Sequence, residues 1–415
     1  MSLSHRLGLT LCLLIGWCVS WTAIARSDNW PGFRGLATAG VVEDGKIPNS
    51  WSETDYRWRI DLGSRDVGSV AVFNGGVFLL SADADRSEMN LRAIDLETGK
   101  ERWKRAFPHA SNHLHGRNTL ASGTPAADED FVYIAHSDRE HTWVRCFDHD
   151  GKPQWTRDFG AAKSQHGFGT SPVIHGDLVL LNFSQQAERM RRGIAPGQSK
   201  VIAMNRSTGE TVWETSVTSR RVCYGTPMVR DGVVYCANTG DGVYALSLET
   251  GEMLWRLPVF KMRCVSCPII IDDLVLGSSG SGGGGNHLVA VRAPKGGAAP
   301  EEVYRIERNA PYVPTAVEHD GALYMVDDNG IASCIDAKTG KNHWTKRIGG
   351  TFSASPILVG DKCLLVNLSG EATIVRASPT FEKLGTMDLG GPVGATPAYV
   401  DGKLLLRIGN ELVCL

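Results

Sequence analysis

An internal repeat runs through most of this 415-residue chain and restricts its fold more than any other feature. Each unit opens with a small residue, often followed by proline, and then reaches an Asp-Gly or Gly-Asp pair and an apolar run. Eight such openings occur, spaced 40 to 55 residues apart: Ser69-Val70, Thr124-Pro125, Ser171-Pro172, Thr226-Pro227, Cys267-Pro268, Thr315-Ala316, Ser355-Pro356 and Thr396-Pro397. A period of this length indicates a solenoid, a propeller or another repeat architecture.

The second half of the unit contains a Thr-Gly turn and then a tryptophan. Thr98-Gly99 is followed by Trp103, and Thr339-Gly340 is followed by Trp344. Glycine between apolar runs predicts tight hairpins, because it takes the positive φ that such turns need. No convincing helical period is present. Four short strands per unit therefore predict an all-β fold, an eight-bladed β-propeller of four-stranded antiparallel blades.

The two ends of the chain predict how the ring closes. Residues 411–415 match the third strand of a unit, with no Thr-Gly turn or tryptophan after them. Residues 56–62 resemble an isolated fourth strand. We expect these N- and C-terminal strands to pair in one blade, which removes an exposed sheet edge.

The N-terminus is predicted to be a secretory signal peptide, residues 1–25. Arg6 precedes an apolar run over 7–19 that is too short to span a bilayer, and Ala23-Ile24-Ala25 is typical of a cleavage site. An uncleaved N-terminal anchor is the alternative. The rest divides into an N-terminal extension, 26–51, and the propeller, 52–415. We expect a periplasmic or other extracytoplasmic protein with no transmembrane segment in its mature chain.

The charge balance argues against one class of partner. The chain has 43 basic and 45 acidic residues, a formal net charge of −2. A nucleic-acid binder would carry a basic excess, so we expect no nucleic-acid partner. A monomer is expected.

The repeat unit resembles that of the pyrroloquinoline-quinone (PQQ) repeat family. The shared string is the apolar-Asp-x-x-Thr-Gly-Lys-x-x-Trp pattern at 95–103 and 336–344, and the resemblance covers 58–415. The segments 30–35, 48–51 and 166–172 are similar to exported members from planctomycete-type bacteria. The resemblance implies that the tryptophans dock against neighbouring blades. The family includes quinoprotein dehydrogenases and non-catalytic members, among them the propeller lipoprotein of the outer-membrane assembly machinery.

Two cysteines are candidates for a contact between blades. Cys223 and Cys264 each lie four residues before the proline of their repeat, so they are expected to face each other. Free buried thiols, a structural disulfide, and redox or metal chemistry all fit this spacing. Quinoprotein dehydrogenases typically carry two adjacent cysteines at the cofactor, and this chain has no Cys-Cys pair.

The segments that precede the openings are the candidate binding surface. If each opening pair starts an innermost strand, the residues before it lie at one mouth of the central channel. Arg117, His166, Arg221 and Arg263 fall in these segments. Such a basic arc favours an acidic partner and makes binding salt-sensitive. Scattered surface charge is the alternative interpretation.

These features favour an exported, non-catalytic propeller that binds or scaffolds a protein partner. We expect no catalytic residue, no metal ligand and no cofactor. One alternative is a dehydrogenase that uses PQQ with Ca²⁺. Another is a carbohydrate-binding propeller with Trp143 and Tyr312 as its aromatic platform.

Overall fold

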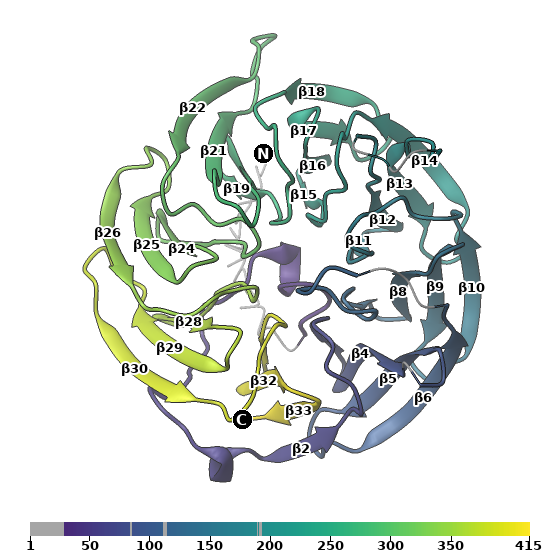
Figure 1. Cartoon of the computed structure of the whole chain (residues 1–415), viewed down its shortest axis with the longest axis vertical. Helices are drawn as coiled ribbons and strands as arrows, with labels where there is room; N and C mark the ends of the chain where they lie inside the picture. Colours follow the sequence, from purple (N-terminus) through teal and green to yellow (C-terminus); the bar gives the residue numbers. More distant parts are fainter. Residues whose placement is uncertain (1–28, 84, 111–113, 189, 191–192) are drawn as a thin grey trace, which may run out of the picture.

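The computed structural model describes residues 29–415 apart from residues 84, 111–113, 189 and 191–192. Its strands form eight sheets arranged in a ring (Figure 1). Each sheet contains four antiparallel strands, which follow one another from the centre of the ring to its rim, and one sheet has an additional parallel strand. The eight-bladed, all-β propeller predicted from the repeats is therefore confirmed.

The first four blades, numbered in chain order, each use four consecutive strands. Blade 1 contains β3 (Ala71–Phe73), β4 (Gly76–Asp83), β5 (Glu88–Asp95) and β6 (Glu101–Pro108); blade 2 contains β7 (Ala126–Ala127), β8 (Phe131–Ser137), β9 (Thr142–Asp148) and β10 (Pro153–Asp158); blade 3 contains β11 (Val173–His175), β12 (Leu178–Phe183), β13 (Ser199–Asn205) and β14 (Thr211–Val217); blade 4 contains β15 (Met228–Arg230), β16 (Val233–Asn238), β17 (Gly242–Ser247) and β18 (Met253–Leu257).

The remaining blades include two that receive strands from the N-terminus. Blade 5 contains β19 (Ile269–Ile271), β20 (Leu274–Ser279), β21 (His287–Arg292) and β22 (Glu301–Ile306); blade 6 contains β23 (Val317–His319), β24 (Ala322–Val326), β25 (Ile331–Asp336) and β26 (Asn342–Arg347); blade 7 contains β27 (Ile357–Val359), β28 (Lys362–Val366), β29 (Glu371–Arg376) and β30 (Lys383–Asp388), with β1 (Val41–Val42) added; blade 8 contains β31 (Ala398–Val400), β32 (Lys403–Ile408), β33 (Glu411–Cys414) and β2 (Trp58–Asp61).

The predicted signal peptide, residues 1–25, lies outside the described residues. In the part of the chain that the structure describes, the helical pieces are the short 3₁₀ turns η1 (Leu36–Thr38) and η2 (Glu53–Asp55), and no helix there is long and apolar enough to cross a membrane.

The ring closes in blade 8 as predicted. β2 pairs antiparallel with β33, and Trp58 lies opposite Cys414 while Asp61 lies opposite Glu411. The N-terminal strand therefore supplies the rim of a blade whose other three strands come from the C-terminus (Figure 1). The sequence resemblance implied that the tryptophans dock on neighbouring blades, and Trp58 does so on blade 1. Its indole N–H donates to the carbonyl oxygen of Leu96 at 2.9 Å, and its ring covers Gly99.

The same docking recurs around the ring and explains the Thr-Gly turn. Trp103, Trp155, Trp213 and Trp344 each donate their indole N–H to a carbonyl in the following blade, and Tyr304 uses its hydroxyl in the same way. Gly251, with φ +73°, shows why the turn needs glycine: a β-carbon there would lie 2.5 Å from the Trp213 ring. Trp58, Trp103, Trp155 and Trp213 each lie over a glycine of the next repeat in this way, whereas Trp344 packs against Phe381.

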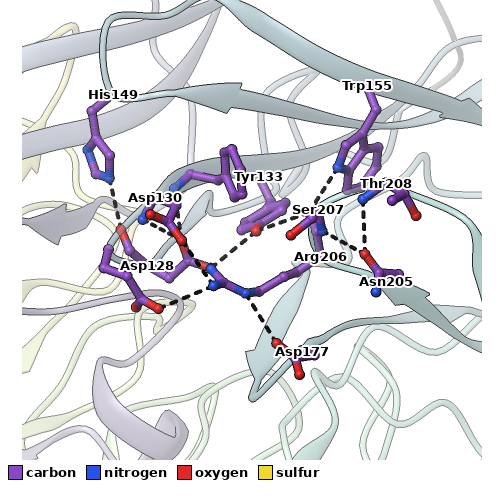
Figure 2. Close-up of polar contacts among 12 residues, drawn as sticks. Asp128, Asp130, Tyr133, His149, Trp155, Asp177, Asn205, Arg206, Ser207 and Thr208 are labelled. Carbon is purple, nitrogen blue, oxygen red and sulfur yellow. Dashed lines mark hydrogen bonds and ion pairs between the residues drawn. The ribbon is translucent and has the colours of Figure 1, made fainter.

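Figure 2 shows this docking between blades 2 and 3, where a polar network surrounds it. The carbonyl oxygen of Arg206 accepts the Trp155 indole N–H at 2.9 Å and the Tyr133 hydroxyl at 3.2 Å. The Arg206 guanidinium pairs with Asp128 at 3.0 Å and Asp130 at 2.9 Å. Because these carboxylates are matched by a guanidinium that is largely buried, the network holds two blades together.

The described part of the N-terminal extension, residues 29–51, packs into the propeller. Trp30 pairs with Val72 of β3 through two backbone hydrogen bonds of 2.8 and 2.7 Å, and β1 pairs in parallel with β27. Between these contacts the chain passes from blade 1 to blade 7. It crosses the centre of the ring, as the purple segment of Figure 1 shows. The extension therefore occupies one end of the channel.

Candidate functional site

The first residues of the opening pairs form a belt of hydroxyl groups around the channel. Seven of the eight openings begin with serine or threonine, and the eighth begins with Cys267. We call these seven side chains the hydroxyl belt, and all of them line a central cavity: Ser69, Thr124, Ser171, Thr226, Thr315, Ser355 and Thr396.

Among the described residues, belt side chains form hydrogen bonds across five of the eight joins between blades. The backbone N–H of Ser69 donates to Oγ1 of Thr124 at 3.2 Å, and the N–H of Thr124 donates to Oγ of Ser171 at 2.9 Å. Bonds of 3.0 Å of the same kind join Cys267 to Thr315, Thr315 to Ser355, and Ser355 to Thr396. Buried N–H groups need acceptors, and at five of the openings a small side chain supplies a hydroxyl oxygen for this purpose.

The N-terminal extension forms the floor of the cavity. Phe33 is among the lining residues, and the carbonyl oxygen of Pro31 accepts the N–H of Ala127 in β7 at 2.8 Å. Gly35 permits a tight turn here: its φ is +73°, and a β-carbon would lie 2.7 Å from the Trp30 ring. The channel is therefore a cup with one closed end.

Arg34 is buried beneath this floor without a carboxylate partner among the described residues. Its side chain is 1% exposed, and Nη2 donates to the carbonyl oxygens of Ala39 at 2.9 Å and Ala316 at 2.8 Å. Within the described ranges, Nε and Nη1 have no acceptor. Burial lowers the pKa of Arg34 to about 10, so the guanidinium remains a cation at neutral pH.

An ion pair spans the mouth at the other end. Arg117 lies between blades 1 and 2, and Asp328 lies in blade 6, nearly opposite in the ring (Figure 1). Arg117 Nη1 is 2.8 Å from Asp328 Oδ1. Asp328 Oδ2 also accepts the backbone N–H groups of Tyr312 at 2.9 Å and Val313 at 3.2 Å. The charge of Arg117 is thus balanced at the mouth.

Two imidazoles lie beside this ion pair on the wall of the mouth. The rings of His115 and His166 pack edge to face with centroids 4.8 Å apart, and both line the cavity. Asn118 Nδ2 donates to the carbonyl oxygen of His166 at 2.6 Å, and the His115 N–H donates to the same oxygen at 3.2 Å. These bonds join the connection between blades 1 and 2 to the connection between blades 2 and 3.

Arg263 and two tyrosines complete the wall. Arg263 is 6% exposed and donates from Nε to the carbonyl oxygen of Val222 at 3.0 Å. The Arg263 guanidinium also interacts with the Tyr312 hydroxyl and partly opposes the effect of burial on its pKa. Burial raises the pKa of Tyr312 and raises that of Tyr224 to about 12, so both phenols stay protonated at neutral pH. The Tyr224 hydroxyl donates to the carbonyl oxygen of Gly167 at 3.1 Å, so the donors that this part of the wall presents belong to Arg263 and Tyr312.

The cavity has a volume of about 460 Å³, and its lining includes three of the four residues predicted for the mouth. Arg117, His166 and Arg263 are brought together there. Arg221 is not among the lining residues that the structure describes, although it lies in the same loop as the lining residue Tyr224. Among the described lining residues there is no aspartate or glutamate. A volume of this size suits a small molecule or the end of a larger one.

The two candidate disulfide cysteines are free thiols and lie against each other, at the join between blades 4 and 5. The backbone N–H of Cys264 donates to Cys223 Sγ at 3.3 Å, and both residues are fully buried. Burial by itself would raise the pKa of Cys223, but hydrogen bonds from the Cys264 thiol and the Thr239 hydroxyl lower it. The predicted contact is present, and of the open alternatives the structure has free thiols.

Sequence reasoning missed two parts of this cavity. The opening Ser and Thr residues were visible as a repeat mark, but their position on a cavity wall was not. The segment that contains Phe33 and Arg34 carried only a resemblance to exported family members, and nothing in it indicated the floor of a cavity. The sequence suggested Tyr312 only as an exposed platform, whereas it is 8% exposed and belongs to the cavity wall.

The repeat, the eight four-stranded blades and the tryptophan docking define the class: this is a PQQ-repeat β-propeller. A family model described as outer membrane protein assembly factor BamB matches residues 54–222, 140–303 and 307–380. The chain belongs to this family.

Two relatives carry the name outer membrane protein assembly factor BamB. The protein from Yersinia pestis is 24% identical over 375 residues, which cover 78% of this chain and 89% of that one. The protein from Legionella pneumophila (strain Paris) is 23% identical over 271 residues, which cover 61% of this chain and 52% of that one. This second match thus spans about half the length of the relative.

The fold is shared with an enzyme. A europium-containing methanol dehydrogenase superposes with a TM-score of 0.68 and 13% identity, covering 92% of this chain and 90% of that chain. An identity this low shows the fold alone, and function must be argued from the site.

Proposed function

We propose that the protein is a non-catalytic binding propeller of the cell envelope that holds a protein partner at its channel mouth. The observation that carries this proposal is the family match, which extends over most of the propeller and leads to relatives named as assembly factors for outer membrane proteins. Assembly of proteins is a function exercised on other proteins, and a rigid propeller presents many loops for that purpose. The predicted signal peptide agrees with a location in the envelope.

The mouth is the proposed contact surface because its basic and titratable groups converge there. Arg117 is one-third exposed and reaches the mouth, and His166 is half-buried beside it. An acidic segment of a partner could compete with Asp328 for Arg117. Binding of this kind is weakened by salt, because the charges are partly solvated. We further propose that the protein acts as a monomer.

The fold family also suggests PQQ with Ca²⁺, and the cavity lining does not fit that pair. Ca²⁺ takes oxygen ligands, among them aspartate and glutamate carboxylates, and none of the described lining residues carries a carboxylate. Arg263, which forms no ion pair with a described carboxylate, would instead place positive charge beside the metal. The chain also lacks adjacent cysteines. These features favour binding over dehydrogenation.

The carbohydrate-binding alternative relies on Trp143 and Tyr312 as open aromatic faces, and the Trp143 ring packs against two histidine rings. The Trp143 ring stacks on His141 with centroids 4.8 Å apart, and it also packs against His136 at 4.9 Å. A sugar-binding platform needs an open aromatic face. Tyr312 faces the cavity but is largely buried, so a sugar polymer has little access to it.

Site-specific photo-crosslinking in cells tests the proposal. A photoreactive amino acid replaces His166 at the mouth, and in a matched strain it replaces Val212, which is 51% exposed on the outer strand β14. We expect a discrete protein adduct from position 166 that is absent from position 212 and is lost in an Arg117→Glu background. No adduct at 166, or the same adduct from both positions, would show that the mouth does not hold a protein partner.

A further inference from the structure

The hydroxyl belt has hydrogen-bond donors that the protein does not use. Thr124, Ser171, Thr315, Ser355 and Thr396 each accept a backbone N–H through their hydroxyl oxygen. In the part of the chain that the structure describes, no protein acceptor lies within hydrogen-bonding reach of their hydroxyl protons. A hydroxyl that accepts an N–H still has one proton to donate. The belt therefore offers a ring of donors to whatever occupies the cavity.

Two further belt hydroxyls take no part in the bonds between blades. Ser69 and Thr226 line the cavity, and no described residue hydrogen-bonds to their hydroxyl oxygens. The hydrogen bonds between blades therefore do not use the hydroxyl groups of Ser69 and Thr226. Their hydroxyls are available entirely to a bound molecule.

The charge around the cavity is positive and not matched by the protein. Arg263 in the wall forms no ion pair with a described carboxylate, and neither does Arg34 beneath the floor. Both are almost completely buried, at 6% and 1% exposure. A buried cation without a counter-charge is costly, and a bound anion would offset that cost. Arg117 adds no net charge because Asp328 neutralises it.

The cavity thus combines many donors, one unmatched cation in its wall, a second cation buried beneath its floor and, among its described lining residues, no carboxylate. A donor-rich, cationic wall selects acceptors that carry negative charge. The volume of about 460 Å³ suits a small molecule. We propose that the cup is a binding site for a small molecule bearing an oxyanion, whose oxygens bond the belt hydroxyls and Arg263. Carboxylate, phosphate and sulfate share this chemistry.

The oxyanion site uses the belt hydroxyls and Arg263, whereas the proposed protein contact uses Arg117 and His166 of the same cavity lining. The two proposals can therefore fail independently.

Isothermal titration of the full-length exported protein tests the site with four probes: inorganic phosphate, sulfate, citrate and glucuronate, each at matched ionic strength. We expect saturable 1:1 binding of at least one probe, and the ranking among the four identifies which oxyanion the cup prefers. Saturable binding of none of them at concentrations up to about 10 mM, which corresponds to about −2.7 kcal/mol, would overturn the proposal.

Matched variants connect binding to the cup. Arg263→Met is expected to weaken the preferred probe at least tenfold, because a charge-assisted hydrogen bond is lost. Arg305→Met makes the same charge change on the outer strand β22, where Arg305 pairs with Glu302, and should alter affinity by less than about twofold. Equal losses in the two variants would mean that the protein binds the anion through its general charge.

A second pair of variants does not depend on the stability of Arg263→Met. Ser69→Ala and Thr226→Val remove hydroxyls that bond no described residue, so the melting temperature should stay near that of the wild type. We expect each to weaken the probe several-fold. Crystals grown with selenate should show the selenium in the belt. Unchanged affinity in both variants, or selenium only outside the cup, would refute the assignment.

Discussion

Trp58 should carry a large part of the stability of the ring closure. The residue belongs to β2, the strand of blade 8 that comes from the N-terminal part of the chain. It is 9% exposed, lies over Gly99 of blade 1 and donates to the Leu96 carbonyl oxygen at 2.9 Å. The side chain thus fixes β2 to blade 1 while the backbone of β2 pairs with β33.

The expected cost of Trp58→Ala follows from these contacts. Replacing a buried tryptophan by alanine typically costs about 3–5 kcal/mol, because transfer free energy is lost and a cavity remains. Trp58→Phe keeps an aromatic ring over Gly99 but leaves the Leu96 carbonyl without its donor. An unsatisfied buried acceptor costs about 1–3 kcal/mol, so this variant should lose less than the alanine variant.

Trp255 supplies the matched control. It occupies the equivalent place in blade 4, but among the described residues its indole N–H has no acceptor, and it is only half-buried. A β-carbon added at Gly296 or Gly297, in the following turn, would meet no atom within 4 Å, so no tryptophan lies over these glycines. Trp255→Ala should therefore cost about 2 kcal/mol or less.

Urea unfolding followed by circular dichroism measures these differences, and hydrogen exchange locates them. In Trp58→Ala the amides of Arg57 and Leu62, which donate to Cys414 and Asn410 at 2.8 and 2.7 Å, should exchange faster than amides in blade 4. Equal destabilisation by Trp58→Ala and Trp255→Ala, or a loss below about 1 kcal/mol for Trp58→Ala, would refute the docking explanation.

Three other predictions follow from single contacts. Gly251→Ala should lose at least about 2 kcal/mol in urea unfolding, because strain at φ +73° adds to the collision with Trp213, whereas Gly232→Ala, at φ +74° with open space around it, should lose only about 1 kcal/mol. Burial, with Arg145 and His109 nearby, lowers the pKa of His136 well below 6.5, so the unfolded chain takes up the proton first as the pH falls. The contribution of neutral His136 to stability should therefore be retained above pH 6.5, and at lower pH the free energy of unfolding should decrease by up to about 1.4 kcal/mol per pH unit. Unfolding of His136→Gln should show a shallower pH dependence. The Arg407 side chain is 2% exposed and lies 3.3 Å from Asp66. Asp66→Asn removes the counter-charge of this buried guanidinium and should lower the free energy of unfolding by about 3–5 kcal/mol, measured by thermal unfolding. A variant as stable as the wild type would contradict this.

Local patterns in the chain were sufficient to predict the repeating parts of this protein. Each of these patterns involves only a few neighbouring residues, so local conformational preferences specify it: the Asp-Gly and Thr-Gly turns, the alternating apolar runs and the tryptophan of the unit. These patterns yielded the number of blades, the four-stranded sheets and the strand β2 that completes blade 8. The pairing of Cys223 with Cys264 followed from the same register, because equal offsets in successive repeats place residues side by side.

The centre of the ring, in contrast, is defined only once the chain has folded. Arg117 and Asp328 are 211 residues apart and meet because the ring places them on opposite sides of one mouth. The extension carries Phe33 and Arg34 to the floor through contacts with blades 1, 2, 6 and 7, none of which is close in sequence. Arg221 shares its offset with His166, yet the lining includes His166 and not Arg221, because a loop's path depends on its neighbours. A cavity is bounded by surfaces from all blades at once, and no local pattern in the chain encodes that enclosure.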